Sequence, residues 1–155
     1  MRRKQLWAAA GLLTAALALT TWGAGGSANA SVTSHATTTT SSPLMQVRHT
    51  PAGTVLANSR GFTVYYYLVD KRGSGRSACT GSCAVLWPPV LGPVRIPAGV
   101  KLPGAVGYIK RPGGARQLTI GGWPVYTYVG DHAPGQSHGE GIGGIWYVIK
   151  VSTSR

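Results

Sequence analysis

Short apolar runs separated by turn-forming residues dominate the chain from about residue 44 to residue 151. The runs are rich in Val, Ile, Tyr and Trp, and Gly, Pro, Asn or Ser bound them, a pattern typical of strands and turns. No run keeps the 3.6-residue period of an amphipathic helix, so the pattern predicts an all-β fold. The predicted strands lie at 53–58, 62–69, 105–111, 115–120, 123–130 and 145–151, with one short helix or turn within 79–86.

The strand pattern occurs twice. GFTVYYYLVD at 61–70 aligns without a gap with GWPVYTYVGD at 122–131. GRSACTGSCAVLW, which follows the first copy, aligns with GQSHGEGIGGIW after the second, with one-residue slips. Such self-similarity indicates a duplication, and we predict β units related by a pseudo-two-fold axis in a small sandwich or barrel with long Gly- and Pro-rich loops. The two predicted repeats span about 53–90 and 115–151.

Alternation along the repeated strand divides its side chains between two faces. The mostly aliphatic face is the better core candidate, whereas Tyr65 and Tyr67, with their equivalents Tyr126 and Tyr128, share the other face. Two interpretations of this tyrosine face stay open: the rings pack under a second layer with bonded hydroxyls, or they form an exposed platform for sugars or an aromatic partner. Three tryptophans are further candidate binding residues: Trp87, Trp123 and Trp146.

Two of the three acidic residues close the repeated strand, since Asp70 and Asp131 stand where a loop begins. A short carboxylate there can accept the backbone N–H groups of the following residues, as in an Asx-turn, and we expect this role for both. Contact with a metal or ligand is the alternative. Catalysis by the pair is disfavoured, because a duplication is expected to place equivalent residues on separate units.

Enzymatic activity is not expected. Paired-carboxylate hydrolysis needs two acids that flank one bond, and Glu140 is the only acidic residue outside the repeated strands. His-Glu-x-x-His is absent, and the glycine-rich run at 139–144 lacks the Lys-Ser/Thr ending of a phosphate loop. The sequence therefore predicts no catalytic residues and no cofactor.

The two cysteines, Cys79 and Cys83, are expected to form a disulfide in an oxidising compartment. A loop this short gives a stabilisation of about 2 kcal/mol, so the bond would fix a local turn. The equivalent positions in the second repeat are Gly139 and Gly143, and glycine permits a similarly tight backbone.

Metal or redox chemistry is the alternative for the cysteine pair. Two cysteines with His132 and His138 could form a tetrahedral zinc or copper site if the loops met. The Cys-x-x-x-Cys spacing differs from the Cys-x-x-Cys of thioredoxin-like proteins.

The N-terminal residues predict export. A basic segment, Arg2 to Lys4, precedes an apolar run, and Ala28-Asn29-Ala30 matches a signal-peptidase site, so we expect a cleaved signal peptide at 1–30. Retention as an uncleaved anchor is the alternative; after cleavage no membrane span is expected. The stretch 31–44 is rich in Ser and Thr and predicts a disordered spacer before a single β domain at 45–152.

Charge suggests the kind of partner. Removal of the leader takes three of the 15 basic residues, and the remaining 12 against three acids leave a net charge of +9. Such a surface attracts an anionic cell-wall polymer or a membrane surface. The basic residues are spread out, so specific nucleic-acid binding is not expected.

The order of motifs resembles a bacterial family. Tyr-x-Tyr-x-x-Asp occurs twice, with CTGSC and WPP after the first copy and GGIWYV after the second. Over about 50–150 the chain is similar to the secreted-repeat family, also described as predicted lipoproteins with a Y-x-(F/W/Y)-x-x-D motif. The resemblance implies an extracytoplasmic protein of unknown function. The chain lacks a lipobox cysteine after the apolar run, so lipid anchoring is not expected.

Two functions follow as hypotheses. The first is a secreted, non-catalytic β module of the cell envelope or the extracellular space. The second is a redox or metal-binding electron-transfer protein that uses Cys79 and Cys83 with His132 and His138.

Overall fold

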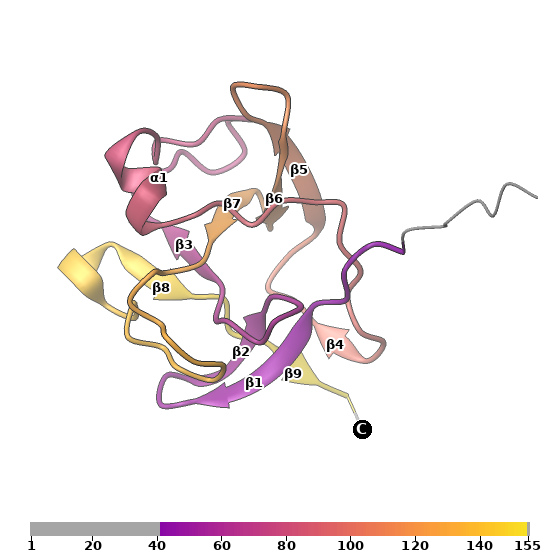
Figure 1. Cartoon of the computed structure of the whole chain (residues 1–155). Coiled ribbons are helices and arrows are strands. Elements are labelled where there is room, and N and C mark those ends of the chain that lie inside the picture. The colour runs from indigo at the N-terminus through magenta and orange to yellow at the C-terminus, as the bar shows by residue number, and fades with distance from the viewer. Residues whose placement is uncertain (1–40, 155) are drawn as a thin grey trace, which may run out of the picture. The chain divides into compact units, whose positions relative to one another are not determined.

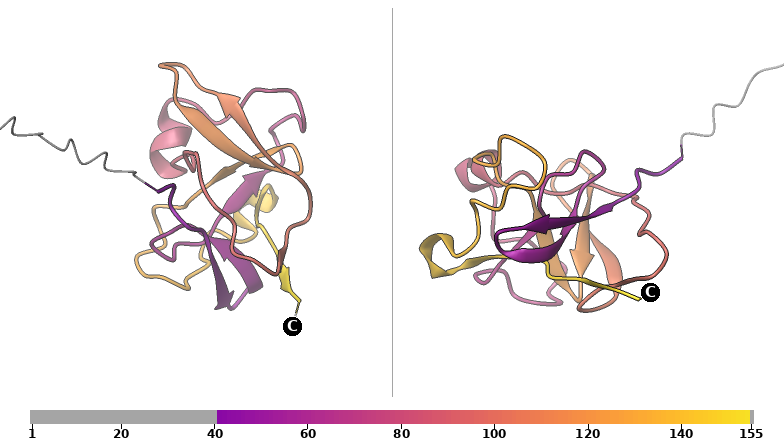
Figure 2. Two further views of the ribbon diagram at one scale, coloured as in Figure 1. Left: turned by 90° about the vertical axis from the view of Figure 1, so that its right-hand side faces the viewer. Right: turned by 90° about the horizontal axis from the view of Figure 1, so that it is seen from below.

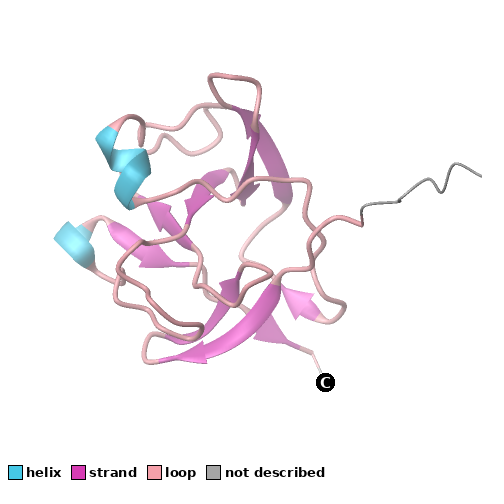
Figure 3. Ribbon diagram, viewed as in Figure 1, coloured by secondary structure: helices cyan, strands magenta, loops and turns pink. Residues whose placement is uncertain are grey.

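Strands make up most of the regular structure in residues 41–154, the part of the chain that the computed structural model describes (Figure 1; Figure 3). The all-β prediction is confirmed. The predicted signal peptide and residues 31–40 of the predicted spacer lie outside the described residues. The elements in chain order are β1 (Gln46–Thr50), β2 (Gly53–Ala57), β3 (Tyr65–Tyr67), α1 (Ser82–Leu86), β4 (Val100–Lys101), β5 (Val106–Lys110), β6 (Arg116–Ile120), β7 (Trp123–Tyr126), the 3-10 helix η1 (Ile142–Gly144), β8 (Trp146–Val148) and β9 (Ser152–Thr153).

The main sheet has five strands in the order β5-β6-β7-β3-β8, and its neighbours are antiparallel. Its two edges, β5 and β8, do not pair with each other, so the sheet is open and does not close into a barrel. β1 with β2, and β4 with β9, form separate two-stranded ribbons. As predicted, Gly121 and Gly122 connect β6 to β7, and both have positive φ angles that glycine adopts without a steric penalty.

The repeated strands are shorter than the pattern predicted. β3 and β7 end before 69 and 130 because the backbone turns at the end of each motif. The N–H of Asp70 donates to the carbonyl of Tyr67 at 3.0 Å, and the N–H of Asp131 donates to the carbonyl of Tyr128 at 3.2 Å. The same turn therefore follows both copies of the motif.

A pseudo-two-fold relation is visible where the two repeats meet. β3 and β7 are antiparallel neighbours, and Tyr65 lies opposite Tyr126. An antiparallel pair of equivalent strands is the arrangement that a two-fold axis between them requires. The prediction of a pseudo-two-fold arrangement is confirmed.

The end of each repeat pairs with the central strand of the other repeat. The N–H of Ile149 donates to the carbonyl of Val64 at 2.8 Å, and the N–H of Val90 donates to the carbonyl of Val125 at 3.0 Å. These two bonds are equivalent in the two repeats. Neither repeat therefore completes its own sheet, and the two units interlock.

Two buried clusters lie on opposite faces of β3 and β7, because successive side chains of a strand alternate between faces. One cluster is mostly aliphatic and includes Val64 and Val125; the other is mostly aromatic and includes Tyr65 and Tyr126. Both faces of the central strands are thus covered, as in a sandwich. Figure 1 shows the two short helices, α1 and η1, on the left-hand side of the fold, and the right-hand view of Figure 2 shows them on the same side again.

Candidate functional site

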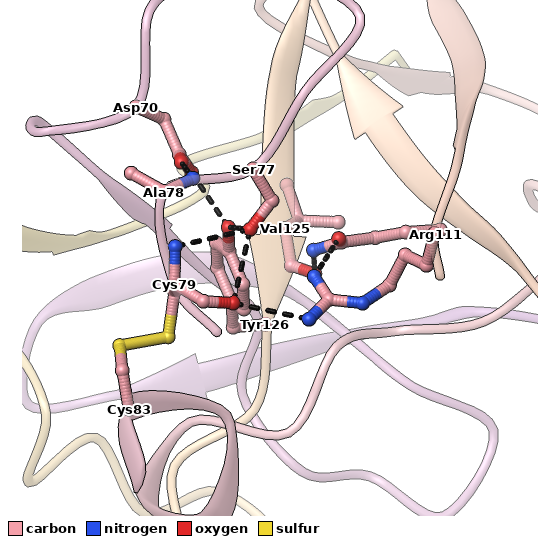
Figure 4. The surroundings of a disulfide bond; sticks show 9 residues. Asp70, Ser77, Ala78, Cys79, Cys83, Arg111, Val125 and Tyr126 are labelled. Carbon is pink, nitrogen blue, oxygen red and sulfur yellow. Dashed lines mark hydrogen bonds between the residues drawn. A yellow bond between two sulfur atoms is a disulfide. The ribbon is translucent and has the colours of Figure 1, made fainter. Parts of the chain in front are cut away.

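The motif tyrosines and aspartates bond across the repeats. The hydroxyl of Tyr65 donates to Asp131 Oδ2 at 2.7 Å, and the hydroxyl of Tyr126 donates to Asp70 Oδ2 at 2.6 Å. Both tyrosines are fully buried, and both aspartates are nearly so. We call these two pairs the reciprocal Tyr–Asp lock. Figure 4 shows the half that contains Asp70.

The second oxygen of each carboxylate holds the loop of its own repeat. Asp70 Oδ1 accepts the N–H of Ala78 at 2.6 Å, and Asp131 Oδ1 accepts the N–H of His138 at 2.8 Å. These partners lie further along the chain than those of the predicted Asx-turn. The turn itself is closed by backbone bonds, so the carboxylates are free to join one repeat's loop to the other repeat's tyrosine.

Burial fixes the protonation of the lock. Desolvation is the largest cause that raises the pKa of Tyr65 and of Tyr126, and the aspartate acceptors raise both pKa values further. Burial also raises the pKa of Asp70, opposed by the hydrogen bonds from Tyr126 and Ala78 and by the charge of Arg111. The tyrosines are therefore protonated donors at neutral pH and unsuited to act as bases.

Four motif rings form one stack, which we call the aromatic column: Tyr67, Trp146, Trp87 and Tyr128, in that order. The successive ring centroids are 4.1, 3.7 and 4.3 Å apart, and the two indoles are inclined by 1°. Trp87 and Trp146 are 5% and 4% exposed. These two candidate binding residues are therefore interior residues, while the outer tyrosines are half-buried.

The lock and the aromatic column pack against each other. Tyr65 meets Trp87 edge-on at 5.4 Å, and Tyr126 meets Trp146 edge-on at 5.3 Å. Both contacts again have equivalents in the two repeats, which extends the pseudo-symmetry to side chains. Aromatic pairs of this kind contribute about 0.5–1.5 kcal/mol beyond their buried area. The tyrosine face is thus packed in the interior and is not an exposed platform.

The predicted disulfide is confirmed, since Cys79 and Cys83 are bonded (Figure 4). His138 contacts Asp131 at 3.5 Å and the carbonyl of Gly130 at 3.1 Å, and the backbone of His132 is bonded to Gln136. Within residues 41–154, no three His, Cys, Asp or Glu side chains gather as a metal site would require.

Glycine at the position equivalent to Cys79 is required by space. A Cβ on Gly139 would lie 2.8 Å from the ring of Trp87 and 2.9 Å from that of Tyr65. Sequence reasoning explained this glycine by backbone freedom, but the φ angle of Gly139 is not in the left-handed region. The column therefore excludes any side chain at this point of the second repeat.

The loop after Asp131 contains one pattern that is associated with catalysis. Gly135-Gln136-Ser137-His138-Gly139 matches Gly-x-Ser-x-Gly. A nucleophile elbow places that serine on a sharp turn from a strand into a helix. Here the segment is a loop of turns without a flanking strand or helix, and the Ser137 hydroxyl makes no hydrogen bond to His138 or Asp131. The match therefore supports no hydrolase assignment.

A cleft of about 390 Å³ lies beside the disulfide loop, and we call it the basic cleft. Its lining holds three cations and no acid: Arg76, Ser77, Thr80, Ile109, Lys110, Arg111 and Pro112. Arg111 is held in place, because its two terminal nitrogens donate to Gln117 at 2.7 Å and to the carbonyl of Cys79 at 3.0 Å. Ser77 bonds Tyr126 at 2.7 Å, which connects the cleft to the reciprocal Tyr–Asp lock.

A second cleft, of about 530 Å³, opens on the face of β3 that carries Tyr66, opposite the face that carries Tyr65, and we call it the aromatic cleft. The side chains that give it its character are three half-buried rings and three charged groups: Tyr66, Trp123, Tyr147, Arg72, Glu140 and Lys150. Of the candidate binding tryptophans, Trp123 alone lines this cleft. Sequence reasoning missed Tyr66 and Tyr147, although alternation along the motif places Tyr66 on the face opposite Tyr65.

Comparison with known proteins gives a family for the chain. A family model described as a secreted repeat of unknown function matches residues 46–91 and 107–150, more than half of the 155 residues. The matched segments include β1 and most of β5, so each repeat begins one strand earlier than the sequence pattern indicated. No curated protein and no solved structure matches the chain.

Proposed function

Because the chain belongs to the family of secreted repeats of unknown function, we propose that it is a non-catalytic extracytoplasmic module that binds an anionic polymer of the cell envelope. Its motif residues hold the two repeats together in the interior, where a polymer has no access. The ligand must therefore be recognised by other residues. The basic cleft supplies them.

The observation that carries this proposal is the charge of the basic cleft. Arg76, Lys110 and Arg111 line it without an acidic neighbour in the lining. Arg76 and Lys110 are exposed, whereas Arg111 is half-buried and fixed by its hydrogen bonds. Guanidinium groups bind phosphate and carboxylate groups through paired N–H donors. The cleft therefore suits the repeated phosphates or carboxylates of an envelope polymer.

The wall of the cleft is rigid, which favours binding. The lining residues Ser77 and Thr80 flank Cys79, whose disulfide to Cys83 fixes this loop. The hydroxyl of Ser77 is also bonded to Cys79 O at 3.1 Å. A site that is already ordered loses less entropy when its ligand binds.

Polymer binding by charge variants tests the proposal. We expect the double variant Arg76→Gln/Lys110→Gln to bind poly(glycerol phosphate) about tenfold more weakly than the wild type, a loss of about 1.4 kcal/mol. The matched control, Arg60→Gln/Lys101→Gln, removes two exposed cations outside this lining. It is expected to bind within about twofold of the wild type, because neither side chain lines the cleft and salt screens exposed charges that do not contact the ligand.

Two results would contradict the proposal. Equal weakening in both double variants would show attraction by net charge without a defined site. Shortening of the polymer during incubation, followed by gel electrophoresis, would show that the protein is an enzyme. An unchanged polymer length and weakening confined to the first variant are the expected outcome.

A further inference from the structure

The aromatic cleft is a second site with different chemistry, and we propose that it binds a pyranose ring of an acidic saccharide. It shares no lining residue with the basic cleft. Variants of one cleft therefore test one proposal without disturbing the other. The inference starts from the way in which the chain uses two neighbouring tyrosines of the motif.

Tyr65 and Tyr66 are adjacent, yet their environments are opposite. The hydroxyl of Tyr65 is fully buried and bonded to Asp131, whereas Tyr66 is half-buried and faces the aromatic cleft. Within the described part of the chain, neither the Tyr66 hydroxyl nor the Trp123 indole N–H makes a hydrogen bond to protein. Polar groups on half-buried rings are available to a ligand with hydroxyl groups.

The rings suit a sugar. Tyr66 lies 5.4 Å from Trp123 and 6.0 Å from Tyr147, centroid to centroid, and both pairs are tilted. The three rings thus line the cleft at an angle to one another and are not stacked face to face. Pyranose rings have a face of C–H groups that packs on aromatic rings, while their hydroxyls bond the surrounding polar groups. A volume of about 530 Å³ accommodates one or two such rings.

The charges select an acidic sugar. Arg72 and Lys150 line the cleft and are exposed, and Arg72 is fixed because its Nε donates to the carbonyl of Gly121 at 2.6 Å. Its terminal nitrogens remain for a ligand carboxylate. Glu140 is partly occupied, since its Oε2 accepts the N–H of Val148 at 2.6 Å, and its second oxygen can accept a sugar hydroxyl.

Nuclear magnetic resonance of the indole N–H groups tests the site in the secreted protein. A glucuronic-acid-containing oligosaccharide is the probe, and a neutral glucose oligomer of the same length is its comparison. We expect the acidic probe to shift the Trp123 indole signal and to leave the signals of Trp87 and Trp146 in place, because both are enclosed in the column. The neutral oligomer is expected to shift the same signal with about tenfold weaker affinity.

Variants separate ring stacking from charge. The Trp123 variants lack the reporting indole, so calorimetric titration measures their affinity. Trp123→Ala is expected to weaken binding of the acidic probe about tenfold, and Trp123→Phe, which keeps a ring, is expected to weaken it about threefold. Arg72→Gln is expected to remove the preference for the acidic probe. The unchanged signals of Trp87 and Trp146 report that each variant is folded.

The site would be refuted by either of two outcomes. The first is that neither oligosaccharide shifts the Trp123 signal at millimolar concentration. The second is that Trp123→Ala binds the acidic probe as well as the wild type while Arg72→Gln abolishes binding, which would show capture of an anion without recognition of a sugar. Loss of sugar binding with retained poly(glycerol phosphate) binding leaves the proposed function of the basic cleft intact.

Discussion

The two repeats agree in the contacts that cross between them and differ in the loops that each keeps to itself. The lock, the column and the exchanged strand pairs occur in both halves. The loop after Asp70 carries a disulfide and a five-residue helix, whereas the loop after Asp131 carries glycines and a single 3-10 turn.

This difference shows where the duplicated sequence is constrained. A residue that contacts the other repeat must suit the partner that the second copy supplies, so a change in one repeat leaves that partner without its contact. A loop residue without such a partner is constrained by its own loop alone, whereas Gly139 also contacts Trp87 and Tyr65 of the other repeat. Comparing equivalent substitutions in the two repeats therefore tests whether the shared motif has a structural role.

The largest effect is expected at the centre of the column. Trp87→Ala and Trp146→Ala each remove an indole that stacks on two rings, and each is expected to destabilise the fold by about 3–5 kcal/mol. Because the two positions are equivalent, the free energies of unfolding in urea are expected to agree within about 1 kcal/mol. If one substitution lowered the free energy of unfolding by less than half as much as the other, the two tryptophans would not have equivalent structural roles.

The lock aspartates are expected to differ. In Asp131→Ala the Tyr65 hydroxyl loses its hydrogen-bond acceptor and is left beside the Gly139 N–H, which is itself a donor. In Asp70→Ala the Tyr126 hydroxyl can still bond the hydroxyl of Ser77. We expect Asp131→Ala to cost about 2–3 kcal/mol and Asp70→Ala about 1 kcal/mol less. Calorimetric melting measures both. Equal melting temperatures, or a more stable Asp131→Ala, would show that Ser77 does not substitute for the carboxylate.

The disulfide loop and the glycine loop come next. Removal of the disulfide by Cys79→Ala/Cys83→Ala is expected to lower the free energy of unfolding by about 2 kcal/mol.

Gly139→Ala is expected to lower the free energy of unfolding by about 1–3 kcal/mol, because its Cβ would meet the rings of Trp87 and Tyr65 at less than 3.0 Å. Gly143→Ala tests the other explanation, since Gly143 has a φ of 59° and its Cβ would make only ordinary van der Waals contact, 3.4 Å from Ile145 Cγ1. A neutral Gly139→Ala in urea unfolding would contradict the account of the column.

Much of the fold followed from the sequence, because alternation and turn residues are local properties. Sequence reasoning located the repeat, the disulfide and six strands (β2, β3 and β5 to β8), and it missed β1, β4 and β9. The reciprocal Tyr–Asp lock could not be predicted from the sequence. Tyr65 and Asp70 belong to the same copy of the motif, and the sequence does not reveal that each motif strand pairs with the equivalent strand of the other repeat. The clefts were also hidden, because their residues come from strands and loops that lie far apart in the sequence. Two residues of the aromatic cleft gave a signal in the sequence: Trp123, a candidate binding residue, and Tyr66, which stands between two motif tyrosines.

A smaller effect is expected at high pH. The folded chain raises the pKa of Tyr65 and Tyr126, so both remain protonated where exposed tyrosines in the unfolded chain ionise, above about pH 10. Unfolding then releases protons, and stability that is fully present below pH 10 is lost as the pH rises, by about 1.4 kcal/mol per pH unit for each tyrosine. Tyr65→Phe and Tyr126→Phe are each expected to lower this slope by one proton in urea titrations. An unchanged slope would mean that the tyrosine ionises while folded.

The central claim is that each motif tyrosine is bonded to the aspartate of the other repeat. Double-mutant cycles in urea unfolding, with Tyr→Phe and Asp→Ala, test it directly. We predict a coupling free energy of about 1 kcal/mol or more for Tyr65 with Asp131 and for Tyr126 with Asp70, and additivity within about 0.5 kcal/mol for the same-repeat pair Tyr65 with Asp70. Coupling within the repeat that equals or exceeds the coupling across the repeats would contradict the account.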